Sequence, residues 1–462
     1  MMNENTAFGK FLAQSGKPKE VPKVESKENH ESGKKVVYVY SGGCSSDNLD
    51  MQRVEDYCRA NGYPITHNPQ KADVIFVGTC TLSKEREDLT VNKIQNFQSL
   101  NPKAEIVPAG CLVRQNPERM GEIHSGLSLP TKTEADWSHL EKILPGEIPI
   151  AEIIDPILIR PHIDWRLIEE FDAFPVLKQR LEKMPEDERN NILEEIFTNK
   201  ALDHKKIAEF YNEGKLSQDE LRELEGYDEQ AAILRIAKGC QGKCTYCAIK
   251  KSRGHLVSSK PEVVLDRFKK ALEEGIKSFK LWADDIGVYG KDIGTDLASL
   301  LENILKEKND FKLEVLAGNP KDFLEIYDRL LPLLKDPRIK YLNVTVQSGS
   351  EKILNDMNRP VDVEKLIDAL KQLREEIPNL IIRTHYMVGF PGETDKDFQE
   401  TVKFMEETKI YKSLIFAFSP RPNTPAEKMD KQIPDDVKQE RAKILEEHRK
   451  AGSEKYYDGS IY

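Results

Sequence analysis

The sequence predicts an α/β protein with a doubly wound N-terminal α/β domain over residues 35–150 and a partial (β/α)6 barrel over residues 231–433. In both regions, β-branched and aromatic runs alternate with segments of helical hydrophobic spacing. Such alternation is typical of parallel sheets covered by helices. The alternation stops between residues 151 and 230, where helical spacing predominates, so we expect a helical insert between the two domains.

The N-terminal region begins with residues 1–34, which are mainly Lys, Glu, Ser, Asn and Pro and are predicted to form a disordered tail. Three strands are then expected, from the runs "KKVVYVYSGGC", "ADVIFVGTC" and "AEIVPAGC". Each run ends in a cysteine, namely Cys44, Cys80 and Cys111. Because parallel strands have their carboxyl ends at one edge of the sheet, we expect these three thiols to converge there.

The predicted insert is strongly acidic. Residues 151–230 contain 21 acidic and 11 basic side chains, a net charge of −10 that equals the formal charge of the whole chain. A solvated outer face is the simpler interpretation, and a docking surface for a substrate is the alternative. The rest of the chain is neutral overall, so composition indicates no strongly basic face for nucleic acid.

Six strand–helix units are expected after the insert. Their strands are the runs "AILRIAKGC", "SFKLWADD", "FKLEVLAGNP", "YLNVTVQSG", "IIRTHYMVGFPGE" and "SLIFAFSPRP". Six units are fewer than the eight of a closed barrel, so a partial barrel is predicted. A helix is expected at the C terminus, over residues 434–462.

Bulk composition favours a cytoplasmic protein without membrane association. Charged residues make up 32% of the chain and hydrophobic residues 39%, as in soluble globular proteins. No apolar run approaches the ~20 residues that a membrane helix needs, and no signal peptide is evident. In a reducing compartment, seven cysteines, an odd number, indicate metal ligation or catalysis rather than disulfides.

The segment "KGCQGKCTYCAIKKSRG" contains Cys240, Cys244 and Cys247 with the spacing C-x3-C-x2-C, on the loop after the first barrel strand. Three thiolates on such a loop can bind three irons of a cubane cluster. Zinc is the alternative. Structural zinc sites, however, are closed by four ligands, and no fourth Cys or His has the required spacing, since His255 lies eight residues beyond Cys247.

On this motif and its position, the chain resembles the radical S-adenosylmethionine (SAM) superfamily. The segments "VQSGSEKILNDMNRP", "YMVGFPGETDKDF", "FSPRPNTPAEKM" and "RGHLVSS" look like its methylthiotransferase branch. The segment "LWADDIGVYGKDIGTDL" is similar to the archaeal and eukaryotic threonylcarbamoyladenosine tRNA methylthiotransferases. "GCSSDNLD", "GTCTLSKERED" and "AGCLVRQ" extend the resemblance to the N-terminal domain, so that it covers about 36–115 and 231–450.

The resemblance implies two 4Fe-4S clusters and two SAM molecules. The cysteines of the 240–247 loop would hold one cluster with an iron open for SAM, and Cys44, Cys80 and Cys111 a second, auxiliary cluster open for exchangeable sulfur. One SAM would methylate that sulfur, and reductive cleavage of the other would give a 5′-deoxyadenosyl radical. This radical would remove hydrogen from an unactivated C–H, which then takes up the SCH3 group. The resemblance also implies a low-potential electron donor such as flavodoxin or ferredoxin. It implies no catalytic residue beyond the two clusters.

SAM contacts are also implied by the resemblance. Tyr246 would lie near the adenine, Asp284 would bind the amino group, and Gln347 and Ser348 would line the site. The turn "GFPGE" at residues 389–393 would allow close backbone approach to adenine. At each position ordinary strand-end structure is the alternative. The implied SAM-binding residues are Tyr246, Asp284, Gln347, Ser348, Gly389, Phe390 and Gly392.

The sequence departs from the family pattern in three respects. Gly78 replaces the Asn that usually precedes the second N-terminal cysteine, and His385 replaces the Asp usual in the strand before "GFPGE". The small β-rich TRAM domain that helps family members to bind RNA does not follow "QERAKILEEHRKAGSEKYYDGSIY", whereas the acidic insert is extra.

These departures lead to a prediction about the substrate. Because phosphate contacts with Lys and Arg supply much of the affinity for nucleic acid, an acidic insert without a TRAM domain predicts a polypeptide substrate. This would be a ribosomally made peptide or a protein side chain, recruited by the insert or the tail. The first alternative is methylthiolation of tRNA adenosine-37. Another is sulfur insertion without the methyl group, and a third is a non-catalytic two-cluster carrier of sulfur or electrons.

Overall fold

The computed structural model describes residues 33–41, 45–66, 68–81, 84–153, 155–159, 180–181, 183–185, 197–198, 201–202 and 231–456. The chain divides into two compact units, Met1–Ile157 with Leu234–Tyr456 and Leu158–Ile233 with Tyr457–Tyr462. The predicted disordered tail and most of the predicted helical insert lie outside the described residues. Within the insert, β5 (Phe197–Thr198) and β6 (Ala201–Leu202) form a short antiparallel pair, which differs from the helical prediction.

The N-terminal domain is built on a parallel sheet with the order β1 (Val37–Tyr40), β2 (Val74–Thr79) and β3 (Glu105–Gly110). Single parallel bridges extend it at both edges, Val37 to Ile65 and Ala109 to Leu129. After β1 the chain therefore passes to Ile65, at the sheet edge beside β1. After β2 it passes to β3, on the opposite side of the sheet. With right-handed crossovers this places successive helices on opposite faces, which confirms the doubly wound prediction.

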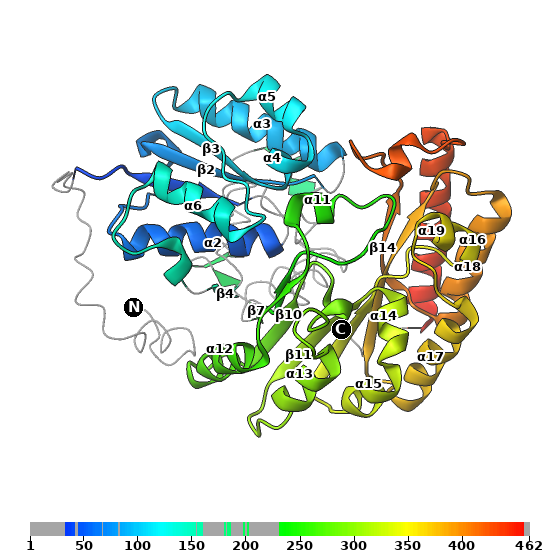
Figure 1. The fold of residues 1–462 in the computed structure, drawn as a ribbon. Coiled ribbons are helices and arrows are strands. Elements are labelled where there is room, and N and C mark those ends of the chain that lie inside the picture. Colours follow the sequence, from blue (N-terminus) through cyan, green and yellow to red (C-terminus); the bar gives the residue numbers. More distant parts are fainter. Residues whose placement is uncertain are drawn as a thin grey trace. The chain divides into compact units, whose positions relative to one another are not determined.

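Helices cover both faces of this sheet (Figure 1), and each face has a hydrophobic core of its own. Helices α2 (Ser45–Ala60) and α6 (Glu134–Ile143) cover one face, and α3 (Lys84–Leu100) and α5 (Pro117–Ile123) cover the other. Successive strand residues point to opposite faces, so each strand contributes to both cores. The first core includes Val54, Tyr57, Val74, Phe76, Trp137 and Leu140, and the second Ile75, Val77, Ile94, Phe97 and Met120.

The barrel is an open seven-stranded sheet with the order β14-β13-β12-β11-β10-β7-β4. The six predicted strands are confirmed as β7 (Ala231–Arg235), β10 (Ser278–Trp282), β11 (Lys312–Gly318), β12 (Ile339–Val344), β13 (Ile381–Val388) and β14 (Lys412–Ala417). Neighbours from β10 to β14 pair in parallel. A seventh strand, β4 (Ile157–Ile159), lies at the edge. It was not predicted because its three residues lie within the region assigned to the insert.

Helices cover the outer face of this sheet (Figure 1). The first, α12 (Pro261–Glu273), places Phe268 against Phe279 of β10 and Phe311, with ring centroids 4.4 and 5.1 Å away. The remaining helices are α13 (Leu297–Ile304), α14 (Pro320–Glu325), α15 (Tyr327–Leu334), α16 (Glu351–Asp356), α17 (Val363–Glu376) and α18 (Asp395–Thr408). The predicted C-terminal helix is confirmed as α19 (Asp435–Tyr456). Among the described residues, we find no helix with the length and apolar character to cross a bilayer.

Candidate functional site

The cysteine loop follows β7 and the two-residue strand β8 (Ala237–Lys238), as predicted, and its three thiols are half-buried. The amide of Cys247 donates to the carbonyl of Cys244 over 3.2 Å, which closes a turn around the last two cysteines. Two further amides donate to sulfur, one to Cys240 over 3.1 Å and one to Cys247 over 3.4 Å. Hydrogen bonds of this kind tune thiolates that bind iron. The donors are the amides of Gly242 and Ile249.

A cluster and a single ion place different demands on the three thiols. In the part of the chain that the structure describes, no three His, Cys, Asp or Glu side chains are placed to hold one metal ion. Zinc needs its ligands about 2.3 Å from one centre, whereas in a 4Fe-4S cluster each cysteine binds a different iron. That the three cysteines bind the predicted cluster stays a prediction.

Burial also favours the protonated form of two of these thiols, Cys240 and Cys247. It raises the pKa of Cys247 to about 12, and burial together with Asp285 raises the pKa of Cys240 well above its usual range. The uncharged thiol is thus the favoured form before iron binds. Because iron binds the thiolate, loading of a cluster must displace these protons.

A guanidinium and a carboxylate contact the cysteine loop from other segments of the barrel. Arg359, which is 8% exposed, donates to the sulfur of Cys244 over 3.5 Å and to the carbonyl of Thr345 over 2.6 Å. The thiol of Cys240 donates to Asp285 over 3.3 Å. Neither Arg359 nor Asp285 was selected from the sequence. The segments "MNRP" and "ADD" contain them, but only the structure shows that they reach the cysteines.

Asp284 connects the loop to the N-terminal domain. One carboxylate oxygen accepts from the amide of Gly239 over 2.8 Å, and the other from the hydroxyl of Ser46 in α2 over 3.1 Å. The indole of Trp282 donates to the same hydroxyl over 2.8 Å. The structure therefore places the predicted SAM ligand Asp284 beside the loop with both oxygens engaged, and its contact with SAM stays a prediction.

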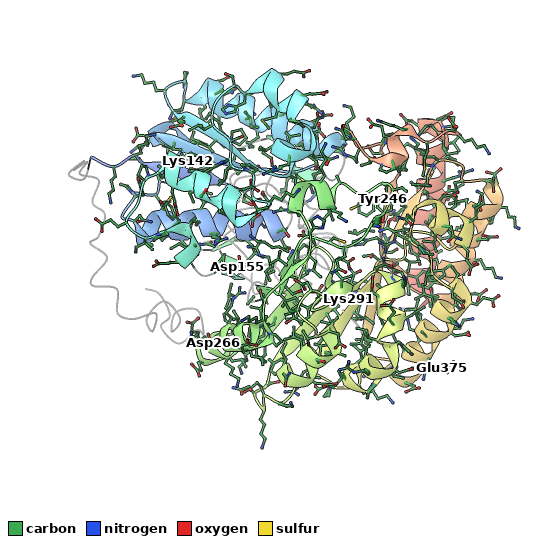
Figure 2. The ribbon with its side chains drawn as sticks, in the orientation of Figure 1. Lys142, Asp155, Tyr246, Asp266, Lys291 and Glu375 are labelled. Atoms are coloured by element: carbon green, nitrogen blue, oxygen red, sulfur yellow. The ribbon has the colours of Figure 1, made fainter. Side chains whose placement is uncertain are left out.

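Tyr246 lies on the cysteine loop between the second and third cysteines (Figure 2). Its ring meets Phe390 edge-on at 6.5 Å, and Phe390 in turn meets Phe418 at 5.3 Å. Phe390 is fully buried, so its side chain belongs to the core behind the loop. The structure thus brings two of the predicted SAM residues together, one on the loop and one in the "GFPGE" turn.

Gln347 has an unusual backbone conformation at the end of β12, with φ of +78°. Its amide donates to the carbonyl of His385, and its carbonyl accepts from Met387, both over 2.8 Å. A non-glycine residue in this region costs roughly 1–3 kcal/mol, and such strain is concentrated at functional sites. Its side-chain Oε1 is buried without a hydrogen-bond partner, so a ligand donor could satisfy it.

Ser348, the next residue, is fully buried and its hydroxyl is engaged within the fold. The hydroxyl lies 3.1 Å from Oγ1 of Thr401 in α18 and accepts from the amide of Ser350 over 3.1 Å. Ser348 thereby fixes the end of β12 to α18. Its predicted contact with SAM stays a prediction.

The "GFPGE" turn is held from within and from α19. Gly389 and Gly392 have φ of +73° and +82°, which glycine adopts without strain. Glu393 accepts from the amide of Gly389 over 2.9 Å and from Arg441 of α19 over 2.8 Å. A Cβ at Gly389 would lie 2.3 Å from Cγ of Lys438, so α19 approaches the backbone closely here.

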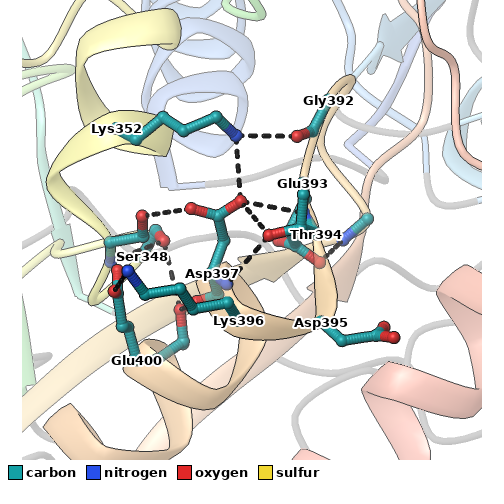
Figure 3. Close-up of polar contacts among 12 residues, drawn as sticks. Ser348, Lys352, Gly392, Glu393, Thr394, Asp395, Lys396, Asp397 and Glu400 are labelled. Atoms are coloured by element: carbon teal, nitrogen blue, oxygen red, sulfur yellow. Dashed lines mark hydrogen bonds and ion pairs between the residues drawn. The ribbon is translucent and has the colours of Figure 1, made fainter.

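The far side of the turn is fixed by a second set of contacts (Figure 3). The ammonium of Lys352 donates to the carbonyl of Gly392 over 2.8 Å and to Asp397 over 2.9 Å. Asp397 also accepts from the amide of Thr394 over 2.8 Å and from Ser350 over 2.8 Å. The turn is therefore preorganised by both neighbouring helices before any ligand binds.

The auxiliary cysteines are partly described. Cys44 lies outside the described residues, whereas Cys80 and Cys111 are half-buried at the ends of β2 and β3. Thr79 pairs with Gly110 in the strand register, so the cysteines that follow occupy neighbouring positions at one edge. The hydroxyl of Thr79 also donates to the carbonyl of Ala109 over 2.6 Å. These two cysteines are thus brought to one edge, as predicted.

The structure gives a reason for glycine at position 78. An ideal Cβ on Gly78 would lie 2.3 Å from Oδ2 of Asp47 and 2.9 Å from its Cγ. Asp47 is 1% exposed and also lies 3.2 Å from the Cβ position of Gly110. The Asp47 carboxylate therefore occupies the space above both glycines, where a side chain at position 78 would otherwise extend.

A buried charge cluster lies near the same helix. Asp50 of α2 is fully buried and accepts from Arg235 of β7 over 2.7 Å, and it also pairs with Arg253 of α11 (Ile249–Arg253). Burial alone would raise the pKa of Asp50, but Lys238, Arg235 and Arg253 hold it far below its usual range. Removing one partner of a buried pair is strongly destabilising, so this cluster fixes α2 against the first barrel strand.

Comparison with known families gives two matches. The family model described as the radical SAM superfamily matches residues 234–405, and the model described as uncharacterized protein family UPF0004 matches residues 36–129. A radical SAM methyltransferase, TsrM from Kitasatospora setae, solved with tryptophan and a SAM analogue, has a TM-score of 0.52 at 14% identity. That alignment covers 85% of this chain and 75% of TsrM. At this identity the likeness concerns the fold alone.

Curated relatives are similar over most of this chain. The human threonylcarbamoyladenosine tRNA methylthiotransferase is 31% identical over 89% of this chain and 62% of its own length. A probable enzyme of the same name from Pyrococcus horikoshii is 29% identical over 88% of this chain and 82% of its own. A tRNA-2-methylthio-N6-dimethylallyladenosine synthase from Aquifex aeolicus is 27% identical, covering 92% and 87%. The chain thus spans less than two thirds of the human relative.

These names overturn the substrate prediction. The relatives are named for tRNA, and the prediction of a polypeptide substrate is therefore wrong. The prediction depended on the acidic insert and on the segment that ends the chain. Neither feature forms part of the cysteine loop or the strand ends that surround it.

Proposed function

We propose that the chain is a radical SAM methylthiotransferase, as its similarity to that family suggests, and that it replaces a C–H hydrogen of an adenosine in tRNA with a methylthio group. The reaction class is supported by the C-x3-C-x2-C loop, whose sulfurs accept backbone hydrogen bonds. The substrate is supported by the names of relatives that align with 88–92% of this chain. The expected products are the methylthiolated RNA, 5′-deoxyadenosine, methionine and S-adenosylhomocysteine.

The cofactors belong to the same proposal. When bound, two 4Fe-4S clusters and SAM would supply the electron that cleaves SAM and the sulfur that is transferred. Cys240, Cys244 and Cys247 would hold one cluster, and the auxiliary cysteines the other. A low-potential donor such as flavodoxin or ferredoxin would provide the electron.

The chain's own residues would orient the reactants. The Arg359 guanidinium beside Cys244 offers a buried cation that stabilises the thiolate. Asp284 fixes the amide just before Cys240, and the unpartnered oxygen of Gln347 can accept a hydrogen bond from a ligand. These groups lie on separate loops and are held there by hydrogen bonds to the backbone, and such preorganisation is what places two reactants at a high effective concentration.

The test uses the full chain, reconstituted anaerobically with iron and sulfide and given SAM, a reductant and tRNA. We expect 5′-deoxyadenosine to form and an adenosine nucleoside to gain the mass of CH2S. Cys240→Ala should abolish both signals. Cys111→Ala should retain 5′-deoxyadenosine formation and lose the methylthio product.

Other outcomes separate the alternatives. Formation of 5′-deoxyadenosine with no change in any tRNA nucleoside would overturn the proposed substrate. A nucleoside that gains only a sulfur atom would indicate thiolation without the methyl group. Absence of 5′-deoxyadenosine from a fully loaded protein would favour the non-catalytic carrier.

A further inference from the structure

The segment that carries the cysteine loop contains no carboxylate. Residues 230–261 include seven lysines and arginines but neither aspartate nor glutamate. Three of these cations are engaged by one buried carboxylate, because Arg235, Lys238 and Arg253 all pair with Asp50. The segment therefore cannot neutralise its remaining cations with acids of its own. These are Lys243, Lys250, Lys251 and Lys260.

Three of the remaining lysines lie beside the cysteines. Lys243 directly precedes Cys244, and Lys250 and Lys251 belong to α11, which begins soon after the third cysteine. Lys243 and Lys251 are exposed, and Lys250 is half-buried. Among the described residues none of the three lysines forms an ion pair, and the contact of Lys251 is with the carbonyl of Gln115, over 3.3 Å.

Hydrogen bonds to the turn after α16 fix the loop around the second cysteine. The side-chain amide of Asn358 donates to the carbonyl of Lys243 over 2.8 Å, and the backbone amide of Thr245 donates to the carbonyl of Met357 over 3.0 Å. Cys244 lies between these two anchored residues and is half-buried. An iron bound to Cys244 would thus lie one residue along the chain from an exposed lysine.

Carboxylates on the neighbouring exposed segments are fewer than these lysines. The end of α16 contributes Asp356, and the short helix η5 (Pro425–Lys428) contributes Glu427 together with Lys428, all three exposed. This short helix contacts the loop through the amide of Ala426, which donates to a loop carbonyl over 2.9 Å. Four ammonium groups and two carboxylates therefore surround the exposed part of the loop.

The proposed reaction needs an electron at this same loop. Reductive cleavage of SAM consumes one electron, which an external donor has to bring to the cluster. A donor protein must come close to the cysteines to transfer it. A positively charged surface attracts a negatively charged protein and raises its association rate by about 10- to 1,000-fold. The lysines lie where such an attraction would be useful.

We propose that Lys243, Lys250 and Lys251 form a docking surface for an acidic protein that donates single electrons. This inference rests on the proposed function and locates its electron donor on the chain. With a flavoprotein donor, the flavin hydroquinone anion loses one electron and becomes the neutral semiquinone. That electron passes to the cluster, and no proton is transferred. RNA phosphates are the other anions that exposed lysines attract, and the test includes them.

The test measures reduction of the cluster rather than methylthiolation. The full chain, reconstituted anaerobically, is mixed by stopped flow with flavodoxin hydroquinone of net negative charge, and the visible absorbance of the cluster is followed at several salt concentrations. We expect the double variant Lys243→Glu, Lys250→Glu to be reduced about tenfold more slowly, or slower still, at low ionic strength. The difference should shrink at high salt, which screens exposed charges. The Kd for oxidised flavodoxin, from isothermal titration, should rise in parallel.

Two controls separate docking from other effects. Lys277→Glu reverses an exposed lysine at the amino-terminal end of β10, whereas the cysteine loop follows the carboxyl end of the neighbouring β7, and should leave the rate unchanged. Photoreduced deazaflavin, a small donor that needs no docking surface, should reduce the wild-type chain and both variants at the same rate.

The outcomes that contradict the proposal are distinct. An unchanged rate with flavodoxin in the double variant would overturn it, and weaker tRNA binding in that variant would then assign the lysines to RNA. Slower reduction by deazaflavin as well would place the defect in the cluster and equally overturn the docking surface.

Failure of this inference differs from failure of the proposed function. If flavodoxin does not reduce the wild-type chain but RNA is methylthiolated with a chemical reductant, the docking surface is wrong and the proposed function stands. If flavodoxin reduces the chain in a way that depends on the lysines but no RNA is modified, the proposed substrate is wrong and the docking surface stands.

Discussion

Ser46 and Asp284 share a hydrogen bond of 3.1 Å although 238 residues separate them in the sequence. Ser46 is the second residue after Cys44, at the start of α2, and is 2% exposed. The other oxygen of Asp284 holds the amide of Gly239, directly before Cys240. The Asp284 carboxylate thus joins the start of α2, the helix that follows Cys44, to the cysteine loop that is proposed to bind the cluster and SAM.

This relationship predicts a specific defect in Ser46→Ala. The variant loses two buried hydrogen bonds, the one to Asp284 and the one from Trp282, at about 1 kcal/mol each, so the protein should remain folded. We expect less methylthiolated RNA per 5′-deoxyadenosine formed, because the two cysteine segments lose a fixed link. Both products are quantified by liquid chromatography and mass spectrometry.

Two comparisons sharpen this test. Thr408→Val removes a different buried hydroxyl, whose hydrogen bond to the carbonyl of Phe404 is 2.7 Å, and should not change the product ratio. Asp284→Ala should show the same uncoupling as Ser46→Ala and, if Asp284 also binds SAM, a higher KM for SAM. An unchanged ratio in Ser46→Ala would show that the link has no positioning role.

Gly78→Ala is predicted to destabilise the N-terminal domain. The new Cβ would lie 2.3 Å from a buried carboxylate oxygen of Asp47, so β2 or α2 must shift. Overpacking of this kind costs roughly 1–3 kcal/mol, which denaturant unfolding can measure. Asp47→Gly in the same chain should restore much of the loss, since it removes the clashing group.

The matched control for that variant is Gly121→Ala. Gly121 lies in α5 and has no atom within 4 Å of its Cβ position. Alanine there should be neutral or stabilising by up to about 1 kcal/mol, because alanine favours helix. Equal effects of the two substitutions would contradict the steric explanation for Gly78.

Sequence patterns were sufficient for most of the fold because strand ends carry distinctive residues. The β-branched runs located the strands, and the position of Cys80 and Cys111 after two such runs placed them at one sheet edge. The strand β4 could not be predicted, since three apolar residues within a helical pattern give too weak a signal.

Contacts between distant segments were not predictable in the same way. Arg359 reaches the sulfur of Cys244 across 115 residues, and no local pattern encodes that approach. The positive φ of Gln347 could not be predicted from the sequence either, because glutamine rarely adopts such a backbone conformation. Composition was misleading for the substrate, because the acidic insert favoured a polypeptide whereas the relatives are named for tRNA.

Arg441→Met is predicted to weaken SAM binding more than iron binding. Arg441 and Glu393 form a buried pair, with side chains 8% and 1% exposed. Breaking such a pair costs roughly 3–5 kcal/mol, because one charge is left uncompensated. Glu393 also holds the amide of Gly389, so the "GFPGE" turn should loosen.

Isothermal titration with SAM and an iron assay would separate the two effects. We expect a clear rise in the Kd for SAM with unchanged iron content, because within the described residues the hydrogen bonds of Arg441 go to Glu393 and Asp395 and not to the cysteine loop. Arg449→Met, which affects an arginine paired with Glu446 further along α19, is the matched control. Parallel loss of iron would show that the turn supports the whole site instead.

His385 should make the stability of the barrel depend on pH. Burial lowers its pKa to about 4, and Arg359 and Lys280 act in the same direction. In the unfolded chain the value returns to about 6.5, so between these limits the unfolded state binds more protons. Stability therefore falls as the pH decreases from about 6.5 toward 4, by at most about 3 kcal/mol from this residue.

His385→Gln should show a shallower loss of stability between pH 7 and pH 5 in denaturant titrations, with His448→Gln on α19 as the matched control. A histidine NMR signal that disappears in His385→Gln and titrates near 6.5 in the wild-type protein would contradict the buried neutral ring.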